Sequence, residues 1–184
     1  MDDTRNVMDE FKGMEHDAIV AQLNARGISL EIAIENTLRD YNMGSIVRTA
    51  NAFGVRTVHV IGRRQWNKRG AMMTDRYLHV RHYASLAVFS LAMQQGRKTV
   101  KALENNISSN IPCRSMYETD MPDNLVLLIG QEGAGLSDEL LSIADEAVYI
   151  PQLGSTRSLN VAVAAGIAMA EWMRQHEIQK DHTR

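Results

Sequence analysis

The chain of 184 residues is 45% hydrophobic, carries a formal net charge of −2, and has three prolines and no Ser/Gly-rich linker, which favours one domain with a well-buried core. Its single cysteine, Cys113, excludes an internal disulfide and indicates a reducing, cytoplasmic location, where a free thiol is typically a small buried hydrophobe. Because the chain begins without the basic-then-apolar order of a signal peptide and has no apolar run near the ~20 residues that span a bilayer, we expect neither secretion nor membrane contact.

The charges are unevenly distributed along the chain. Residues 56–101 hold ten Lys or Arg and one acid, Asp75, a net charge of +9. The other ten basic and twenty-one acidic residues leave −11 for the rest of the chain. A block of this sign favours a polyanionic partner such as RNA over the alternative of a merely solvated face.

Residues 1–28 are predicted to form an acidic, helical extension. Ile19, Val20 and Leu23 fall on one helix face, and Gly27 stands where that helix would end. We expect this helix to pack on a single domain at residues 29–176. Residues 177–184 are predicted to be a loosely ordered polar tail.

A strand–helix–strand unit is predicted over residues 30–61. Leu30–Ile34 alternates in the manner of a strand, and Thr57–Ile61 predicts a second strand. Between them, apolar residues at helical spacing precede Gly54, a typical helix end. Such a unit implies a parallel strand pair with a right-handed crossover.

Residues 63–83 lack periodicity and are predicted to form a basic loop. The cations expected to contact RNA phosphates are Arg63, Arg64, Lys68 and Arg69. Trp66, Tyr77 and Tyr83 are interleaved with the basic residues, and such rings stack on bases of single-stranded RNA. The alternative is a solvated face with the rings tucked beneath it.

The rest of the chain continues to alternate helix and strand. Helices are predicted at Leu86–Gln95, at 137–144 and from Leu159 to about His176, and strands at Thr99–Leu103, Leu125–Ile129 and Ala147–Ile150. The last helix is apolar nearly all round, so we expect it to be mostly buried. This alternation predicts an α/β fold of three layers with a mainly parallel sheet.

The last two predicted strands each stop at a glycine-bearing loop, residues 130–136 and 151–160. Open α/β sheets bind ligands at the carboxyl ends of their strands, and glycine lets a backbone approach closely there.

Three motifs in this order resemble the SpoU (TrmH-type) branch of the SPOUT RNA methyltransferases. The first is Asn42-x-Gly44-Ser45-Ile46-x-Arg48-Thr49-Ala50. The second is Leu128-Ile129-Gly130-x-Glu132-Gly133-x-Gly135-Leu136, and the third is Ile150-Pro151-x-x-Gly154-x-x-x-Ser158-Leu159-Asn160-Val161. The resemblance covers about residues 30–172 and departs from the family at Gln152, where Met is usual.

The resemblance implies features that the pattern alone does not give. They are a C-terminal trefoil knot, a homodimer, S-adenosylmethionine as cofactor, and methyl transfer to a ribose 2′-hydroxyl of tRNA or rRNA. The implied cofactor contacts are Leu128, Gly130, Ile150, Gly154 and Leu159. Taken singly, each of these residues is explained equally well by turn formation or strand-end packing.

The candidate catalytic residues are Arg48, Asn42, Glu132, Ser158 and Asn160. A guanidinium with a pKa above about 12 is a poor base. We therefore expect Arg48 to clamp a phosphate and stabilise negative charge on the ribose oxygen, with Asn42 orienting its loop and Glu132 holding it. Ser158 is also a ready N-cap for the last helix, and Asn160 is expected in the first helical turn, facing the cofactor.

Other classes of protein fit less well. A Rossmann dehydrogenase needs Gly-x-Gly-x-x-Gly directly after its first strand, and a Walker-type hydrolase needs Gly-Lys-Ser/Thr. His59, His79 and His82 lack the spacing of metal ligands, so no metal is predicted. The remaining alternative is a non-catalytic RNA-binding protein of the same fold, against which the intact motif residues argue.

Overall fold

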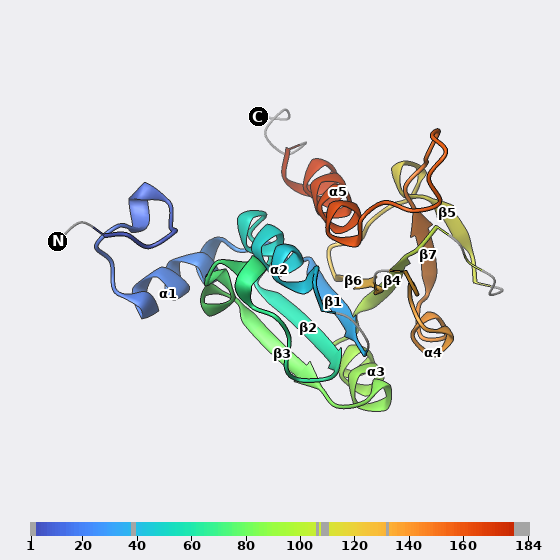
Figure 1. The fold of residues 1–184 in the computed structure, drawn as a ribbon, viewed down its shortest axis with the longest axis horizontal. Helices are drawn as coiled ribbons and strands as arrows, with labels where there is room; N and C mark the ends of the chain where they lie inside the picture. The colour runs from blue at the N-terminus through green and yellow to red at the C-terminus, as the bar shows by residue number, and fades with distance from the viewer. Residues whose placement is uncertain (1–2, 38–39, 106, 108–110, 132, 179–184) are drawn as a thin grey trace.

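A computed structural model describes residues 3–37, 40–105, 107, 111–131 and 133–178 of the chain. Seven strands form one sheet in the order β3-β2-β1-β6-β4-β7-β5, and every neighbouring pair is parallel (Figure 1). The strands are β1 (Glu31–Asn36), β2 (Thr57–Gly62), β3 (His79–Tyr83), β4 (Thr99–Leu103), β5 (Cys113–Ser115), β6 (Leu125–Ile129) and β7 (Glu146–Tyr149). The α-helices are α1 (His16–Arg26), α2 (Met43–Ala52), α3 (Leu86–Gln95), α4 (Asp138–Leu141) and α5 (Val161–Met173).

Short helical turns complete the described structure. They are η1 (Asp9–Phe11), η2 (Arg69–Ala71), η3 (Thr74–Tyr77), η4 (Met116–Glu118) and a π-helical turn, η5 (Arg174–Ile178), that continues α5. In the part of the chain that the structure describes, no helix combines the length and the apolar character needed to cross a membrane.

The two faces of the sheet bury separate cores, which confirms the predicted three layers. On one face, Ile32, Val58 and Leu127 pack beneath α2 and α5. On the other face, Val126 and Leu128 pack against α3 and α4. Figure 1 shows these helix pairs on opposite sides of the sheet. Alternate side chains of one strand point to opposite faces, so strands that are buried on both sides are apolar throughout.

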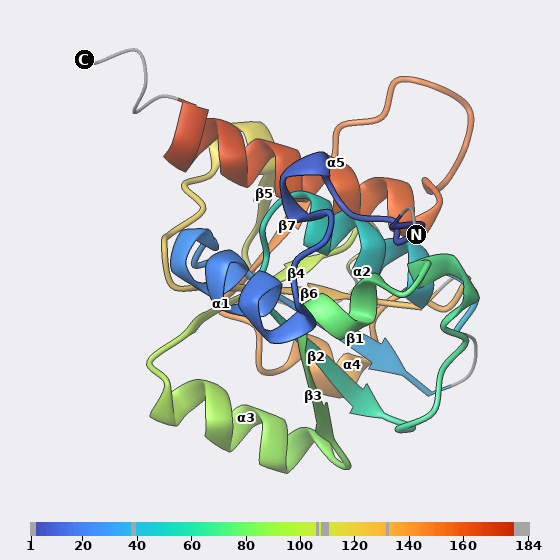
Figure 2. The same ribbon diagram turned by 90° about the vertical axis from the view of Figure 1, so that its left-hand side faces the viewer.

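The N-terminal extension packs on the domain through a third cluster. Phe11 of η1 and Ile19 of α1 are buried against Tyr77 of η3, with Val20 and Leu23 beside them. Figure 2 faces this end of the molecule and shows α1 in front of the sheet. The helix predicted in residues 1–28, with Ile19, Val20 and Leu23 on one face, is therefore confirmed.

Two sequence predictions are wrong at the edges of the sheet. Residues 79–83 are not loop but the edge strand β3, which pairs in parallel with β2. Four of its five residues are exposed, so no buried-strand pattern marks it, and its charged side chains protect an open edge. Cys113, expected to be buried, is exposed at the start of the opposite edge strand, β5.

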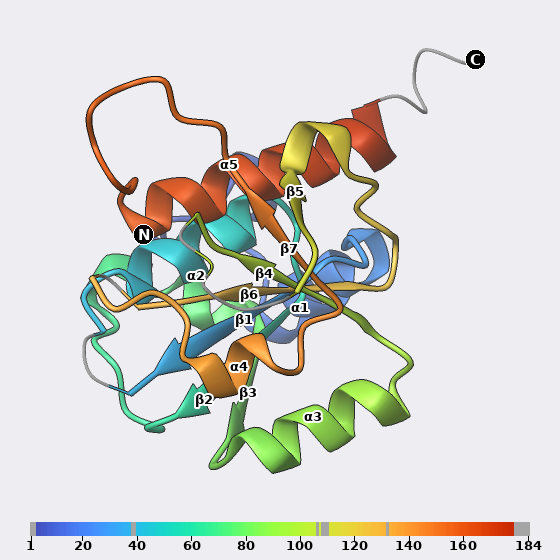
Figure 3. The same cartoon turned by 90° about the vertical axis from the view of Figure 1, so that its right-hand side faces the viewer.

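The parallel strands bring their carboxyl ends to one side of the molecule. The chain leaves β1 there toward α2, leaves β6 through residues 130–136, and leaves β7 through a long loop to α5. Figure 3 shows this last loop arching outward before it returns to the start of α5. The predicted parallel sheet thus places all three motifs at the same edge.

Candidate active site

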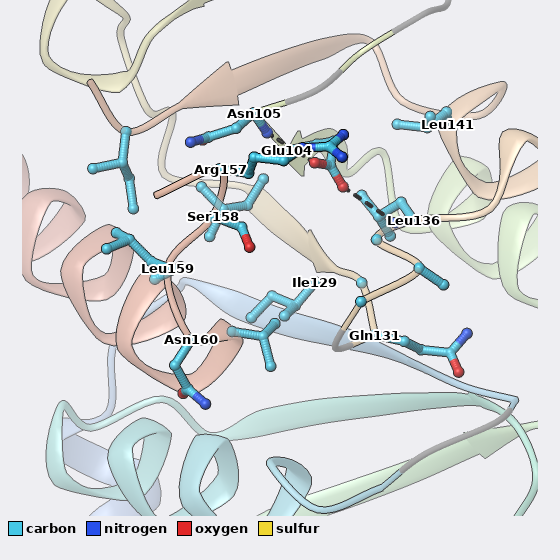
Figure 4. A pocket seen from close by; sticks show the side chains of 18 of the residues that line it. Glu104, Asn105, Ile129, Gln131, Leu136, Leu141, Arg157, Ser158, Leu159 and Asn160 are labelled. Carbon is cyan, nitrogen blue, oxygen red and sulfur yellow. Dashed lines mark hydrogen bonds between the residues drawn. The ribbon is translucent and has the colours of Figure 1, made fainter. Parts of the chain in front are cut away.

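A cavity of about 670 Å³ lies over the carboxyl ends of β6, β4 and β7. Its walls are the 130–136 loop, the end of the β7–α5 loop and the first turns of α5, with Leu103, Glu104 and Asn105 following β4 (Figure 4). Ile129, Ile150 and Leu159 give it apolar surface. A deep, partly apolar cavity with a few converging polar groups is the usual form of a small-molecule site.

The glycine loop after β6 is closed by its own backbone. Gln131 and Gly135 exchange two hydrogen bonds, of 2.9 and 3.0 Å between nitrogen and oxygen. A Cβ added to Gly130 would lie 2.4–2.6 Å from backbone atoms of Gly135 and Leu136. The close approach that requires glycine at position 130 is therefore made by the chain itself, which shapes the cavity wall without any ligand.

Asn160 joins two of the motifs. Its Oδ1 accepts hydrogen bonds from the backbone N–H groups of Ala162 (3.0 Å) and Val163 (3.3 Å), and its Nδ2 donates to Oδ1 of Asn42 (3.0 Å). Asn160 is thus the N-cap of α5, so the expectation that it lies within the first helical turn is wrong, and the alternative that Ser158 caps this helix is not what the structure shows. Both Ser158 and Asn160 line the cavity.

The structure brings some of the predicted cofactor contacts to the cavity and not others. Gly130, Ile150 and Leu159 line it. Leu128 is fully buried in the core under α3 and α4, away from the wall. Gly154 is exposed on the outer loop, where an added Cβ would meet no atom within 4 Å, so no close approach explains this glycine. Glu132 lies outside the described residues.

Arg48 is exposed on α2. The next residue, Thr49, lies where α2 packs closely against α5. A Cβ added to Gly166 of α5 would lie 3.5 Å from Cγ2 of Thr49. The positions four residues away on α2 are Gly44 and Ala52, so the helix itself offers Arg48 no acid there. Arg48 is not among the residues that line the cavity, and its guanidinium is available to a ligand outside it.

A smaller hollow connects the first motif to the cavity. It is lined by Tyr41, Asn42 and Glu35, and it shares Gly130, Gln131 and Val161 with the large cavity. The hollow has a volume of about 10 Å³, room for about one water molecule, so an acceptor group would lie over it, beside Asn42, and not inside it. The arrangement suits two substrates that meet at a shared boundary.

Glu104, Asn105, Asp138 and Arg157 also line the cavity, and sequence reasoning missed all of them. The carboxylate of Glu104 accepts hydrogen bonds from the backbone N–H groups of Asn105 (2.9 Å) and Leu136 (3.3 Å). One signal was available in the sequence: Glu104 directly follows the predicted strand Thr99–Leu103, whose carboxyl end lies at the ligand-binding edge.

The basic loop is anchored beside the first motif. Nδ2 of the buried Asn36 donates to the carbonyl oxygens of Arg63 (2.7 Å) and Gln65 (3.0 Å), and Asp40 accepts from the N–H of Asn67 (2.8 Å). The predicted RNA contacts Arg63, Arg64, Lys68 and Arg69 are all exposed. Lys68 also pairs with Asp75 at 2.8 Å.

The predicted stacking of the interleaved aromatic residues on RNA bases is wrong for Tyr77, whose ring is buried. Trp66 and Tyr83 are half-buried and pack against the two main cores. The +9 block is likewise not one surface. Lys98 pairs with Glu31 (2.6 Å), and the buried Lys101 pairs with Glu146 (2.8 Å).

Comparison with known proteins places these motifs in a family. Residues 29–170 match the SpoU rRNA Methylase family. The tRNA (guanosine(18)-2′-O)-methyltransferase of Thermus thermophilus is 30% identical over 161 residues, covering 83% of this chain and 78% of its own length. The enzyme of the same name from Escherichia coli is 28% identical over 162 residues, covering 86% and 69%.

Two solved structures are similar over most of the chain. The A. aeolicus TrmH/SpoU tRNA modifying enzyme superposes with a TM-score of 0.75 at 26% identity, covering 92% of this chain and 86% of its own. The SpoU methyltransferase AviRb from Streptomyces viridochromogenes, in complex with the cofactor AdoMet, superposes with a TM-score of 0.72 at 25% identity, covering 84% and 63%.

Changing Asn160 distinguishes its two capping hydrogen bonds from its hydrogen bond to Asn42. Asn160→Ala removes the cap and should destabilise the fold by about 1 kcal/mol, whereas Asn160→Asp keeps a capping oxygen and should stay near wild type. Thermal unfolding measures both, because about 1 kcal/mol moves the midpoint by about 2–4 °C in a chain of this size. Equal losses in the two variants would show that the cap is not what Asn160 contributes.

Proposed function

Because this chain belongs to the SpoU rRNA Methylase family, we propose that the cavity binds S-adenosylmethionine and that the acceptor ribose lies beside Asn42, over the small hollow. The activity is S-adenosylmethionine-dependent methylation of an RNA ribose 2′-hydroxyl, as the named 2′-O-methyltransferase relatives and an AdoMet-bound relative support. The observation that carries the placement is the Asn160–Asn42 hydrogen bond, which joins the cavity to the first motif.

The residues of the cavity fit this cofactor. Leu103, Ile129, Ile150 and Leu159 offer the apolar slot that an adenine ring needs, and the 130–136 loop supplies backbone groups at its edge. When bound, the cofactor supplies a methyl group on a positively charged sulfur. The chain's own task is then to place the ribose oxygen in line with that methyl group and to exclude water.

In the transfer the ribose oxygen would bond to the methyl group and release its proton to the solvent. The oxygen gains negative charge as the proton leaves, so a fixed cation near it lowers the barrier. Arg48 supplies that cation as a bidentate clamp on the neighbouring phosphate, because a guanidinium holds its proton and matches the phosphate geometry. Asn42, held by Asn160, orients the loop in front of Arg48. Ser158 faces the cavity, and we propose that Glu132 supports Arg48 from the glycine loop.

The basic loop is proposed as the RNA surface. Asn36 and Asp40 fix it next to Asn42, so phosphates bound by Arg63, Arg64, Lys68 and Arg69 would place a neighbouring ribose beside Asn42. The non-catalytic alternative predicts no cofactor affinity, and calorimetric titration with S-adenosylmethionine decides between the enzyme and a protein that only binds RNA.

The named relatives act on tRNA and on 23S rRNA, and mapping 2′-O-methyl groups in cells that lack the gene identifies the substrate.

A homodimer and a trefoil knot are also proposed. The exposed apolar residues Val163 on α5 and Leu153 on the preceding loop support a dimer through α5 and the region of the first motif. Two features support the knot: β4 lies between β6 and β7 in the sheet, and α5 packs on α2. Tracing the chain in a crystal structure tests it. A cytoplasmic location and the absence of a metal stay predictions from the sequence.

Substitutions of Arg48 test whether this residue acts as a phosphate clamp or as a general base. Arg48→Ala should lower kcat on the order of 10²–10³-fold, and Arg48→Lys should keep part of the activity because it keeps the cation. Cofactor affinity should not change, since Arg48 lies outside the cavity. A pH–rate profile of the Lys variant distinguishes the two roles, and a flat profile supports the clamp. A log-linear rise toward pH ~10.4, absent in the wild type, contradicts it.

Charge reversal in the basic loop should weaken RNA binding in a salt-dependent way. For a variant with Arg63, Arg64 and Arg69 changed to Glu, the slope of log affinity against log salt should fall by about 0.7–0.9 for each phosphate that the loop no longer neutralises. The matched control is Arg97→Glu, an exposed arginine at the turn between α3 and β4. Equal slopes in both variants would mean that the loop is a solvated face.

The dimer proposal is tested by one pair of substitutions. Val163 on α5 is 53% exposed and Val88 on α3 is 55% exposed, so either position in an isolated protomer tolerates a charge equally. Light scattering should give twice the chain mass of 20.6 kDa for the wild type and Val88→Asp, and the protomer mass for Val163→Asp. A wild type of about 20.6 kDa at micromolar concentration rules out the dimer.

A further inference from the structure

Glu104 places a carboxylate at the wall of the cavity, where apolar residues such as Leu103 and Ile129 and polar residues such as Asn105 and Arg157 also lie. It directly follows β4, the strand that lies between β6 and β7, so it stands at the middle of the cavity floor. Two backbone N–H groups orient it, one from Asn105 and one from Leu136 of the glycine loop. An added Cβ on Gly135 would lie 2.4 Å from its Oε2, so the loop is shaped around this side chain.

A half-buried carboxylate that is held in one orientation is built to accept hydrogen bonds, and it has about four lone-pair positions on two oxygens. In doubly wound nucleotide-binding sheets, an acid at the carboxyl end of a strand accepts hydrogen bonds from ribose hydroxyls. We propose that Glu104 binds the ribose 2′- and 3′-hydroxyls of the cofactor and thereby selects an adenosine nucleoside. This rests on the proposal that the cavity is the cofactor site.

The position of Glu104 favours the ribose over the other polar parts of the cofactor. The methyl group must lie near Asn160 and Asn42, and β4 is two strands from β1, about 10 Å at the usual strand spacing. Figure 4 shows Arg157 projecting toward the same end of the cavity as Glu104, away from Asn160. The positive charge of Arg157 at this end of the cavity would repel the ammonium group of the cofactor if that group lay next to Glu104.

The adenine ring is the other candidate for contact with Glu104. Its edge presents a ring-nitrogen acceptor beside the amine, and that nitrogen would face a carboxylate unfavourably. Two vicinal hydroxyls are both donors, and they match the two oxygens of one carboxylate. The geometry thus suits the diol.

The test combines ligand and protein changes, with binding measured by calorimetry. The ligands are S-adenosylhomocysteine, its 2′,3′-dideoxy analogue, and 5′-methylthioadenosine, which keeps the ribose and lacks the amino-acid tail. Glu104→Gln should bind S-adenosylhomocysteine and 5′-methylthioadenosine about tenfold more weakly than the wild type, and the dideoxy analogue equally well. Glu139→Gln, which changes an exposed carboxylate of α4 outside the cavity wall, should leave all three affinities unchanged.

Three results would overturn the inference. One is an equal loss for the dideoxy analogue, and another is a loss that disappears with 5′-methylthioadenosine, which would place Glu104 at the tail. The third needs no variant and therefore survives a misfolded Glu104→Gln: a wild type that binds S-adenosylhomocysteine and its dideoxy analogue equally. A wild type that binds none of the ligands refutes the cofactor site itself, a different outcome from these.

Discussion

The side chain of Asn160 is the constraint on which the rest of the site depends. One amide caps α5 through Ala162 and Val163 and reaches Asn42, 118 residues away along the chain. Because the cap fixes where α5 begins, it also fixes the end of the long loop that forms one wall of the cavity. The same amide therefore fixes the distance between the cavity wall and the first motif, and the proposed methyl transfer would need that distance to be fixed.

The cavity is preorganised by the chain rather than by a ligand. Gly130 allows the loop to fold back on Gly135, and two hydrogen bonds between Gln131 and Gly135 hold it there. Glu104 is fixed against this loop by the N–H of Leu136. A site whose walls are already in place loses little conformational entropy on binding, so more of the contact energy appears as affinity.

The sequence predicted what depends on local pattern. Strands buried on both faces, such as Leu125–Ile129, are apolar throughout and were found where expected. The edge strand β3 was missed because its pairing comes from β2 and not from its own composition. The basic block was overestimated as a surface because Lys98 and Lys101 pair with carboxylates that only the fold brings near them. Ser158 and Asn160 both have side chains that can cap a helix. Only the folded structure shows that α5 begins after Asn160, which is therefore the cap.

The sheet order explains why RNA and cofactor can meet. From β1 the chain first adds β2 and β3 on one side, and the later strands lie on the other side of β1, in the order β6-β4-β7-β5. Open α/β sheets have their crevice at such a reversal, outside the carboxyl ends of the strands. Asn36, at the end of β1, holds the basic loop on one side of this point, and Gly130, at the end of β6, opens the cofactor cavity on the other. Because β1 and β6 are hydrogen-bonded neighbours, the ends of these two strands lie one strand spacing apart, and the two proposed binding sites begin at them, with Asn42 beside both.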